Sequence, residues 1–186
     1  MGLLLDKAII FAVNAHRGQL RKGSNAPYIL HPMEAAAIVA AMTDDEEVIA
    51  AAVLHDTVED TAVTLDEICE QFGKRVAELV AAESENKRED KPAASTWKIR
   101  KEETIAEIGK MNRDEKIIVL ADKLSNVRAI YRDYAVLGDG LWEKFNCRDK
   151  NEQGWYYKSI CDALREDFEK DFAWLELFEL TARVFG

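Results

Sequence analysis

The sequence of 186 residues contains little cysteine and no long apolar run. Its three cysteines, Cys69, Cys147 and Cys161, are widely spaced and form no Cys-x-x-Cys pair, which argues against a disulfide framework and against a thiolate zinc site. Asp6 interrupts the first apolar residues too early for a signal peptide, and no window of about 18 residues is apolar throughout. We therefore expect a cytoplasmic protein without a membrane-spanning segment.

Basic residues are also scarce, because 25 Lys and Arg stand against 35 Asp and Glu, for a formal net charge of −10. This balance argues against non-specific binding to nucleic acid or to an anionic membrane. The acidity is concentrated in residues 43–70, which hold ten acidic residues and no Lys or Arg, and basic residues flank this block at 17–22 and 87–101. The charge pattern is therefore compatible with a small polyphosphorylated ligand.

Proline and glycine are sparse, with three and nine residues respectively, so little in the chain interrupts helices. Apolar residues recur at three- and four-residue steps, and no alternating strand pattern is found. We expect helices at about 4–15, 32–42, 46–58, 64–72, 76–80, 97–110, 114–134 and 155–178, a loop at 85–96, and an ambiguous segment at 138–150. The sequence predicts an all-α protein with a single domain over residues 1–186.

Several helix starts carry local signals. Pro32 is expected at the first helical position, which its fixed φ favours. Thr43 with Glu46, and Thr64 with Glu67, have the spacing of capping boxes.

The segment from Leu54 to Asp60 is the most informative for chemistry. His55 and Asp56 are neighbours at the end of an apolar helix, so their side chains point about 100° apart and can reach one ion. Glu59 and Asp60 follow one turn later. Burying these groups together without a cation would be costly, since like charges repel and lose their hydration.

Two further residues complete a candidate metal site. His31 precedes Pro32 at a helix start, and Asp122 lies within the apolar run of residues 117–124. With His55 and Asp56 they offer two imidazoles and two carboxylates, which suit manganese, iron or zinc with open water positions. Taken singly, His31 could equally cap its helix and Asp122 could form a buried salt bridge.

The flanking motifs resemble those of a known family. The six motifs are His16-Arg-Gly-Gln19, Arg21-Lys-Gly23, Pro27-Tyr-Ile-Leu-His-Pro32, Leu54-His-Asp-Thr-Val-Glu-Asp-Thr61, Phe72-Gly73 and Leu120-Ala-Asp-Lys-Leu-Ser-Asn126. In order and spacing they resemble the hydrolase domain of the RelA/SpoT-type alarmone enzymes, which are HD-domain metal phosphohydrolases. The resemblance covers about residues 3–134. It implies an HD-domain helical bundle, which a C-terminal helical region at about 138–186 would extend.

The resemblance also implies roles. It assigns His31, His55, Asp56 and Asp122 to one manganese ion, and Glu59 and Asp60 to the attacking water, with Glu59 favoured as the base. It places substrate contacts at Arg17, Arg21, Lys22, Tyr28 and Asn126, although Arg17 could instead cap the first helix and Tyr28 could be a core residue. Nothing in the chain resembles a synthetase or regulatory domain, so we expect a stand-alone small alarmone hydrolase, similar to the metazoan SpoT homologue.

One segment departs from the family pattern. Residues 81–101 lack the family's Val-Thr-Asp-like stretch and instead carry basic residues, which either reach the distal diphosphate or form a solvated loop: Lys87, Arg88, Arg100 and Lys101. The implied reaction removes pyrophosphate from the ribose 3′ position of ppGpp or pppGpp. Two alternatives stay open. The same site could act on adenine alarmones or NADPH, or the protein could be a non-catalytic nucleotide sensor or antitoxin-like protein. No nucleic-acid or membrane partner is expected, and the oligomeric state is open.

Overall fold

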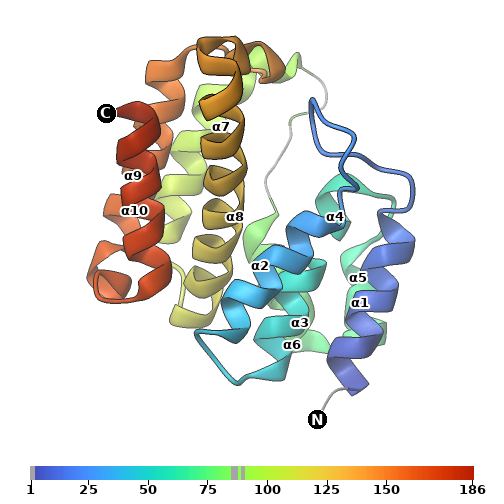
Figure 1. Cartoon of the computed structure of the whole chain (residues 1–186). Coiled ribbons are helices and arrows are strands. Elements are labelled where there is room, and N and C mark those ends of the chain that lie inside the picture. The colour runs from blue at the N-terminus through green and yellow to red at the C-terminus, as the bar shows by residue number, and fades with distance from the viewer. Residues whose placement is uncertain (1–2, 85–87, 89–90) are drawn as a thin grey trace. The chain divides into compact units, whose positions relative to one another are not determined.

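The computed structural model describes residues 3–84, 88 and 91–186. Within these residues the chain is helical apart from its loops, and the extended contact between Leu20 and Pro27 is an isolated bridge rather than a strand (Figure 1). The all-α prediction is confirmed. None of the described helices combines the length and the apolar character that a membrane crossing would require.

The chain divides into two compact units, of residues 1–84 with 112–122 and of residues 85–111 with 123–186. Helix α8, Arg113–Leu137, contributes to both. A single domain over the whole chain stays a prediction, and each unit is described by itself.

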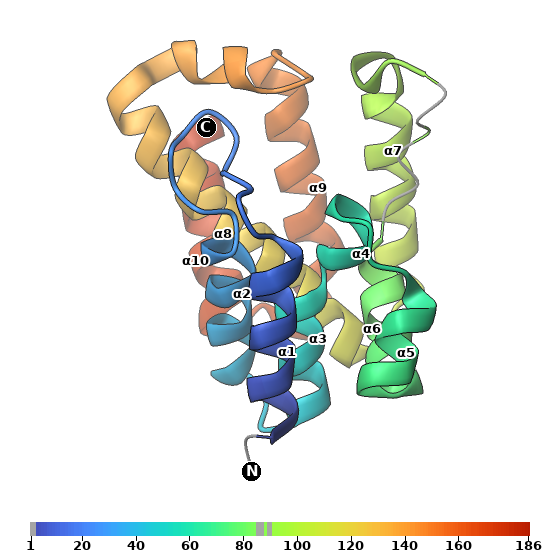
Figure 2. The same ribbon diagram turned by 90° about the vertical axis from the view of Figure 1, so that its right-hand side faces the viewer.

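The first unit is built around helix α3. Its helices are α1 (Leu3–Ala15), α2 (Leu30–Ala40), α3 (Glu46–Leu54), α4 (Thr57–Asp60), α5 (Leu65–Phe72) and α6 (Lys74–Glu83), together with the start of α8. Helix α3 contacts α1, α2 and α6 (Figures 1 and 2). Residues 50–54 of α3 are completely buried, and three of them are alanines, whose small side chains let the surrounding helices approach.

The helix starts agree only partly with the sequence. Helix α2 begins at Leu30, so Pro32 occupies the third helical position rather than the first. The cap of α3 is Asp45, whose side chain accepts the Glu47 N–H at 3.0 Å, and the capping box predicted at Thr43 is therefore wrong. The box between Thr64 and Glu67 is confirmed in both directions. Gly73, with φ of 92°, lets α5 end and α6 begin at the next residue.

Helix α3 ends at Leu54, four residues earlier than the predicted end at residue 58. The Thr57 hydroxyl donates to the Leu54 carbonyl at 2.7 Å. Such a local side-chain bond competes with the helical pattern. His55 and Asp56 consequently lie in the break before the short helix α4, rather than along one continuous helix.

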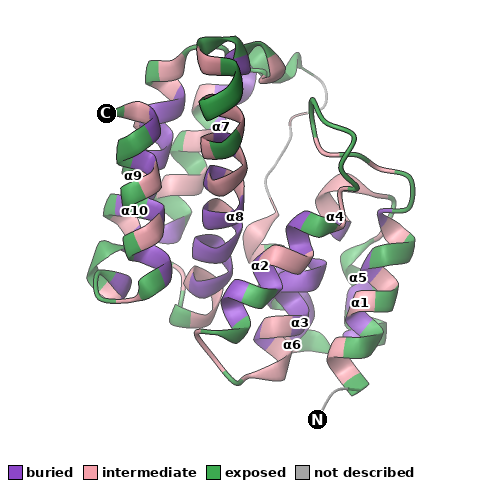
Figure 3. Cartoon of the chain, viewed as in Figure 1, coloured by how far each residue is buried: buried purple, intermediate pink, exposed green. Residues whose placement is uncertain are grey.

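The second unit contains α7 (Ala93–Ile108), the later part of α8, a 3₁₀ helix (Gly138–Lys144), α9 (Lys150–Phe168) and α10 (Phe172–Phe185). The single helix predicted at 155–178 is wrong, because the chain reverses at residues 169–171 and α10 packs back against α9 (Figure 1). The indole of Trp174 donates to the Cys161 carbonyl at 2.9 Å across this pair. Figure 3 shows that both helices bury one side.

An ion-pair network ties together three helix starts of the first unit. The Arg75 guanidinium, near the start of α6, donates to both carboxylate oxygens of Asp45 at 3.1 and 2.8 Å, to Glu47 at 2.7 Å and to Asp114 at 2.8 Å. Arg75 holds the pKa of Asp45 below its usual value. These side chains are about 40% exposed, so solvent weakens each pair.

We predict that Arg75→Gln lowers the free energy of unfolding at pH 7 by about 1 kcal/mol, since several exposed pairs are lost together. Because the pKa of Asp45 is lowered by folding, its stabilising contribution is present above the ordinary Asp pKa of about 4 and is lost as the pH falls through the lowered value. Urea denaturation of the wild type and the variant at several pH values should show the difference shrinking in acid. Lys74→Gln, which removes one exposed i,i+4 pair, is the control; equal effects of the two changes at pH 7 would contradict the network.

Candidate metal centre

Four predicted metal ligands come together within the first unit. His31 lies in the first turn of α2, His55 and Asp56 lie at the break between α3 and α4, and Asp122 lies on α8. Both imidazoles and Asp122 are buried. Asp122 is surrounded in sequence by the buried residues 117–121 and 124, so the apolar face of α8 carries this carboxylate inward.

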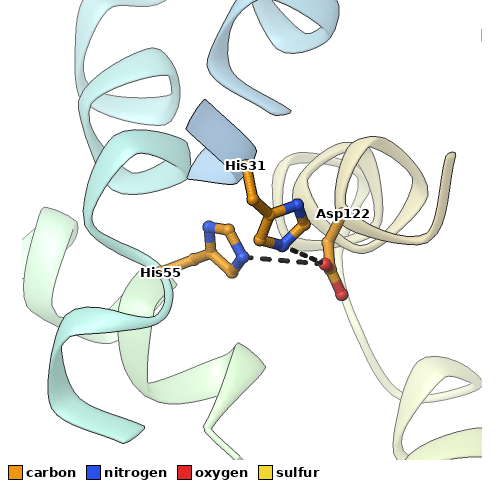
Figure 4. A group of neighbouring side chains, drawn as sticks. All are labelled: His31, His55 and Asp122. Atoms are coloured by element: carbon orange, nitrogen blue, oxygen red, sulfur yellow. Dashed lines mark ion pairs between the residues drawn. The ribbon is translucent and has the colours of Figure 1, made fainter. Parts of the chain in front are cut away.

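The side chains converge on a common point. His31 Nε2 lies 3.0 Å from Asp122 Oδ1 and 3.4 Å from Asp56 Oδ2. His55 Nε2 lies 3.1 Å from Asp56 Oδ2 and 3.7 Å from Asp122 Oδ1. Figure 4 shows both rings directed at the Asp122 carboxylate. One ligand atom from each of His31, His55 and Asp122 lies within 4.8 Å of the others, so these residues could hold one metal ion.

The orientation of His55 is fixed by the backbone. Its Nδ1 lies 2.8 Å from the Ala52 carbonyl oxygen, which can only accept, so Nδ1 carries a proton and donates. In the neutral ring Nε2 then presents its lone pair to the cluster. In that form the buried Nε2 has no proton to donate to the carboxylates that face it. A lone pair facing carboxylates requires a proton or a cation between them, so the residues fit a metal ion.

Electrostatics point to the same need for positive charge. Burial lowers the pKa of His55, but the carboxylates of Asp56 and Asp122 outweigh it and place the pKa well above its usual value. Burial also opposes ionisation of Asp56, yet the imidazoles of His55 and His31 hold the pKa of that carboxyl well below its usual range. A divalent cation supplies the positive charge that bound protons supply in its absence.

Tyr28 has partners that the sequence did not reveal. Its hydroxyl lies 2.6 Å from Asp56 Oδ2 and 2.7 Å from Asp60 Oδ2. Burial and the charges of these two carboxylates raise the pKa of Tyr28 far above its usual value, so the hydroxyl keeps its proton. The Arg21 guanidinium lies 5.6 Å from the centre of the Tyr28 ring. The ring therefore lies beneath Arg21, while the hydroxyl contacts the carboxylates of Asp56 and Asp60.

Two more residues of this site were missed. His16 is buried, and its Nδ1 lies 2.8 Å from Gln19 Oε1. Gln19 Nε2 in turn donates to the Asp60 backbone carbonyl at 2.8 Å. The signal was present in the motif His16-Arg-Gly-Gln19, but nothing in the sequence indicates that Gln19 reaches a residue 41 positions away.

The predicted base residues lie in α4, which is a single turn. Glu59 and Asp60 are both half-buried. Asp60 N–H donates to the Asp56 carbonyl at 2.9 Å, so the acidic pair is held one turn beyond the predicted ligand Asp56.

The other predicted substrate contacts of the first unit lie at the end of α1 and in the loop that leads to α2. Arg17 is exposed and donates to the Asn14 side chain at 2.9 Å. Lys22 is exposed and Arg21 is half-buried.

The remaining predicted substrate contacts belong to the second unit. Lys87 lies outside the described residues. Arg88 is held by Glu103 through two bonds of 2.8 and 2.6 Å. Arg100 is buried, with Nη2 3.5 Å from the Ala93 carbonyl, and Lys101 Nζ lies 4.9 Å from the centre of the Tyr156 ring. Asn126 is half-buried on α8.

Comparison with known proteins bears on this cluster. The model of the HD domain family matches residues 8–148. The chain is 40% identical over 131 residues to the bifunctional (p)ppGpp synthase/hydrolase SpoT of Escherichia coli K12, an alignment that covers 68% of this chain and 18% of that protein. The chain spans less than a fifth of the length of the curated relatives it matches.

Two solved structures match over most of their length. A metazoan ortholog of SpoT that hydrolyses ppGpp is similar with a TM-score of 0.78 and 27% identity, covering 98% of this chain and 96% of the other. A protein of Listeria monocytogenes EGD-e is similar with a TM-score of 0.73 and 33% identity, covering 86% of this chain and 96% of the other. The family resemblance expected from the motifs is confirmed.

We predict that the protein binds one divalent cation and that Asp122→Asn, which keeps the shape of the side chain, abolishes most of this binding. Removing a group that only hydrogen-bonds to a metal ligand lowers metal affinity by about 10- to 100-fold, so loss of a ligand carboxylate should weaken Mn²⁺ binding by more than about 100-fold. Calorimetric titration with Mn²⁺ measures the affinity. Thermal unfolding gives a second readout, because free cation at about 100 times its Kd stabilises the folded state by about 2.7 kcal/mol.

Asp66→Asn is the matched control, since it removes an exposed carboxylate in the first turn of α5. Wild-type affinity in Asp122→Asn, or no stabilisation of the wild type by Mn²⁺, would show that the cluster is not a metal site.

Proposed function

The chain belongs to the HD domain family, and from this premise we propose that it is a metal-dependent hydrolase that removes pyrophosphate from the ribose 3′ position of ppGpp and pppGpp, giving GDP or GTP. The observation that carries the proposal is the convergence of the buried His31, His55 and Asp122 and the half-buried Asp56 on one point. The structural similarity of this chain to a ppGpp-hydrolysing protein, over nearly the whole of both chains, supports the choice of reaction.

His31, His55, Asp56 and Asp122 would hold one manganese ion. Two imidazoles and two carboxylates without a thiolate form a donor set suited to such a borderline-hard cation. A bound ion of this kind lowers the pKa of water and polarises a phosphoryl oxygen. The Nδ1–H bond of His55 to Ala52 keeps Nε2 as the donor atom, so the protein and not the ligand sets the ring orientation.

Glu59 would act as the general base, with Asp60 as its helper. The water oxygen would form a bond to the phosphorus attached to the 3′ oxygen, while the bond between that phosphorus and the 3′ oxygen breaks. Glu59 takes one proton of the water and returns it to solvent, and the 3′ oxygen, which is the leaving group, takes a proton from solvent and becomes a hydroxyl. The products are pyrophosphate, which carries the new oxygen, and the nucleotide with a free 3′ hydroxyl. The Tyr28 hydroxyl contacts Asp60, and Glu59 lies half-buried beside it on the same short helix.

The nucleotide would be bound by the basic residues of the first unit that precede the acidic block. Arg21 and Lys22, with Arg17, are the candidates for the base and the proximal phosphates, and the Tyr28 ring supports Arg21 from below. The other candidates from the sequence, Asn126, Lys87, Arg88, Arg100 and Lys101, belong to the second unit and stay predictions.

We expect the purified protein with Mn²⁺ to release pyrophosphate from ppGpp, and His55→Ala to abolish this release because the cation loses an imidazole. Chromatographic product analysis with a panel of ppGpp, pppGpp, adenine alarmones and NADPH measures the substrate preference. Turnover of another nucleotide with the same Mn²⁺ dependence would move the proposal to that substrate. Nucleotide binding without turnover would instead indicate a sensor.

We further expect Glu59→Gln to lower kcat by about 10²- to 10⁴-fold, the usual contribution of a general base, and Asp60→Asn to lower it less. Mn²⁺ affinity should be unchanged in Glu59→Gln, because Glu59 is not a proposed ligand. Steady-state kinetics measure kcat, and Glu70→Gln, an exposed residue of α5, is the matched control. A larger loss in Asp60→Asn would reverse the two roles.

A further inference from the structure

The Tyr28 hydroxyl joins two carboxylates for which different tasks are proposed. Its oxygen lies 2.6 Å from Oδ2 of Asp56, a proposed metal ligand, and 2.7 Å from Oδ2 of Asp60, which is proposed to assist the general base Glu59. Both distances lie in the range of charge-assisted O–H···O bonds, so the single phenol proton can be donated to either carboxylate. A displacement of this one oxygen would therefore change the orientation of both carboxylates.

A closed ring of hydrogen bonds holds Tyr28 and Asp60 together. The Tyr28 hydroxyl contacts the Asp60 side chain, the Asp60 carbonyl accepts from Gln19 Nε2 at 2.8 Å, and the Gln19 carbonyl accepts from Tyr28 N–H at 2.9 Å. The ring connects the loop after α1 with the short helix α4. Because α4 has only one turn, it cannot fix its own side chains as a longer helix would.

His16 fixes the direction of the Gln19 amide within this ring. Its Nδ1 lies 2.8 Å from Gln19 Oε1, which can only accept, so Gln19 Nε2 is turned toward Asp60. The imidazole is buried, and its ring centre lies 4.9 Å from that of Tyr28. The packing of the two rings keeps the phenol in one place.

The backbone of Tyr28 also belongs to the ligand framework. Its carbonyl accepts the N–H of His31 at 2.9 Å at the start of α2. One residue thus contacts a proposed ligand through its side chain and supports another through its main chain. The position of Tyr28 is consequently determined from both sides of the site.

We propose that Tyr28 is a positioning residue, whose hydroxyl, braced by Gln19 and His16, holds the carboxylates of Asp56 and Asp60 in the geometry that the cation and the water require. This inference rests on the proposed function for the role of Asp60. A phenol has one proton for two acceptors, so it donates to the more basic carboxylate. A cation held by Asp56 would make Asp56 the poorer acceptor and leave the proton for Asp60, which ties the orientation of Asp60 to the state of the metal cluster.

The test is Tyr28→Phe, which removes the oxygen and keeps the ring beneath Arg21. We expect the Kd for Mn²⁺ to rise by about 10-fold and kcat to fall by about 10- to 100-fold, the usual effects of losing a second-shell bond. KM should stay within about twofold, because positioning acts on the reacting groups rather than on substrate binding. Calorimetric titration with Mn²⁺ alone and steady-state kinetics on ppGpp provide the three values.

Tyr134→Phe is the matched control. The Tyr134 hydroxyl also faces a carboxylate, that of Asp139 at 3.3 Å, but it belongs to the second unit and lies outside the proposed machinery. Its removal should leave the Kd for Mn²⁺ and kcat unchanged. Circular dichroism of each variant verifies folding, and Gln19→Met, which opens the ring while keeping the Tyr28 hydroxyl, replaces Tyr28→Phe if that variant does not fold; a lowered kcat at constant KM is then expected.

Two results would overturn the inference. Wild-type Kd for Mn²⁺ together with wild-type kcat in Tyr28→Phe would mean that the hydroxyl positions nothing, and a rise in KM alone would make it a substrate contact. The proposed function fails separately, if the wild type hydrolyses no nucleotide of the panel. In that event the Mn²⁺ titration still decides whether Tyr28 positions the cluster.

Discussion

The structure of the first unit depends on one electrostatic requirement: carboxylates that face buried imidazole nitrogens need positive charge between them. Asp56 and Asp122 lie 3.0 to 3.7 Å from the Nε2 atoms of His31 and His55. Water cannot supply this charge at a buried position, and a lone proton supplies less of it than a divalent cation does. The arrangement is therefore better explained by metal binding than by folding stability.

The helices are arranged to meet this requirement from three directions. The α3–α4 break presents His55 and Asp56, the first turn of α2 presents His31, and the buried face of α8 presents Asp122. The core of α3, rich in alanine, brings α1, α2 and α6 close to it. Tyr28, Gln19 and His16 then form an outer layer that joins the cluster to the short helix with the acidic pair.

Much of the fold could be predicted from the sequence because helical periodicity and capping act locally. The helix at 4–15, the Thr64 box and the stop at Gly73 follow from residues within one or two turns of each other. The errors have tertiary or competing causes. The bond from Thr57 to the Leu54 carbonyl ends α3 early, and the indole bond from Trp174 to Cys161 forms only once α10 has folded back on α9.

The sequence by itself determined which candidate groups are present: two histidines and two aspartates that resemble a family motif in order and spacing, an acidic pair one turn beyond, and basic segments on either side. Residue type and spacing suffice there because they define which donor atoms exist. Only the tertiary structure decided how these atoms are aimed. The place of the Tyr28 hydroxyl depends on Asp56 and Asp60, 28 and 32 residues away. A hydrogen bond across such distances arises from packing, and no local pattern records it.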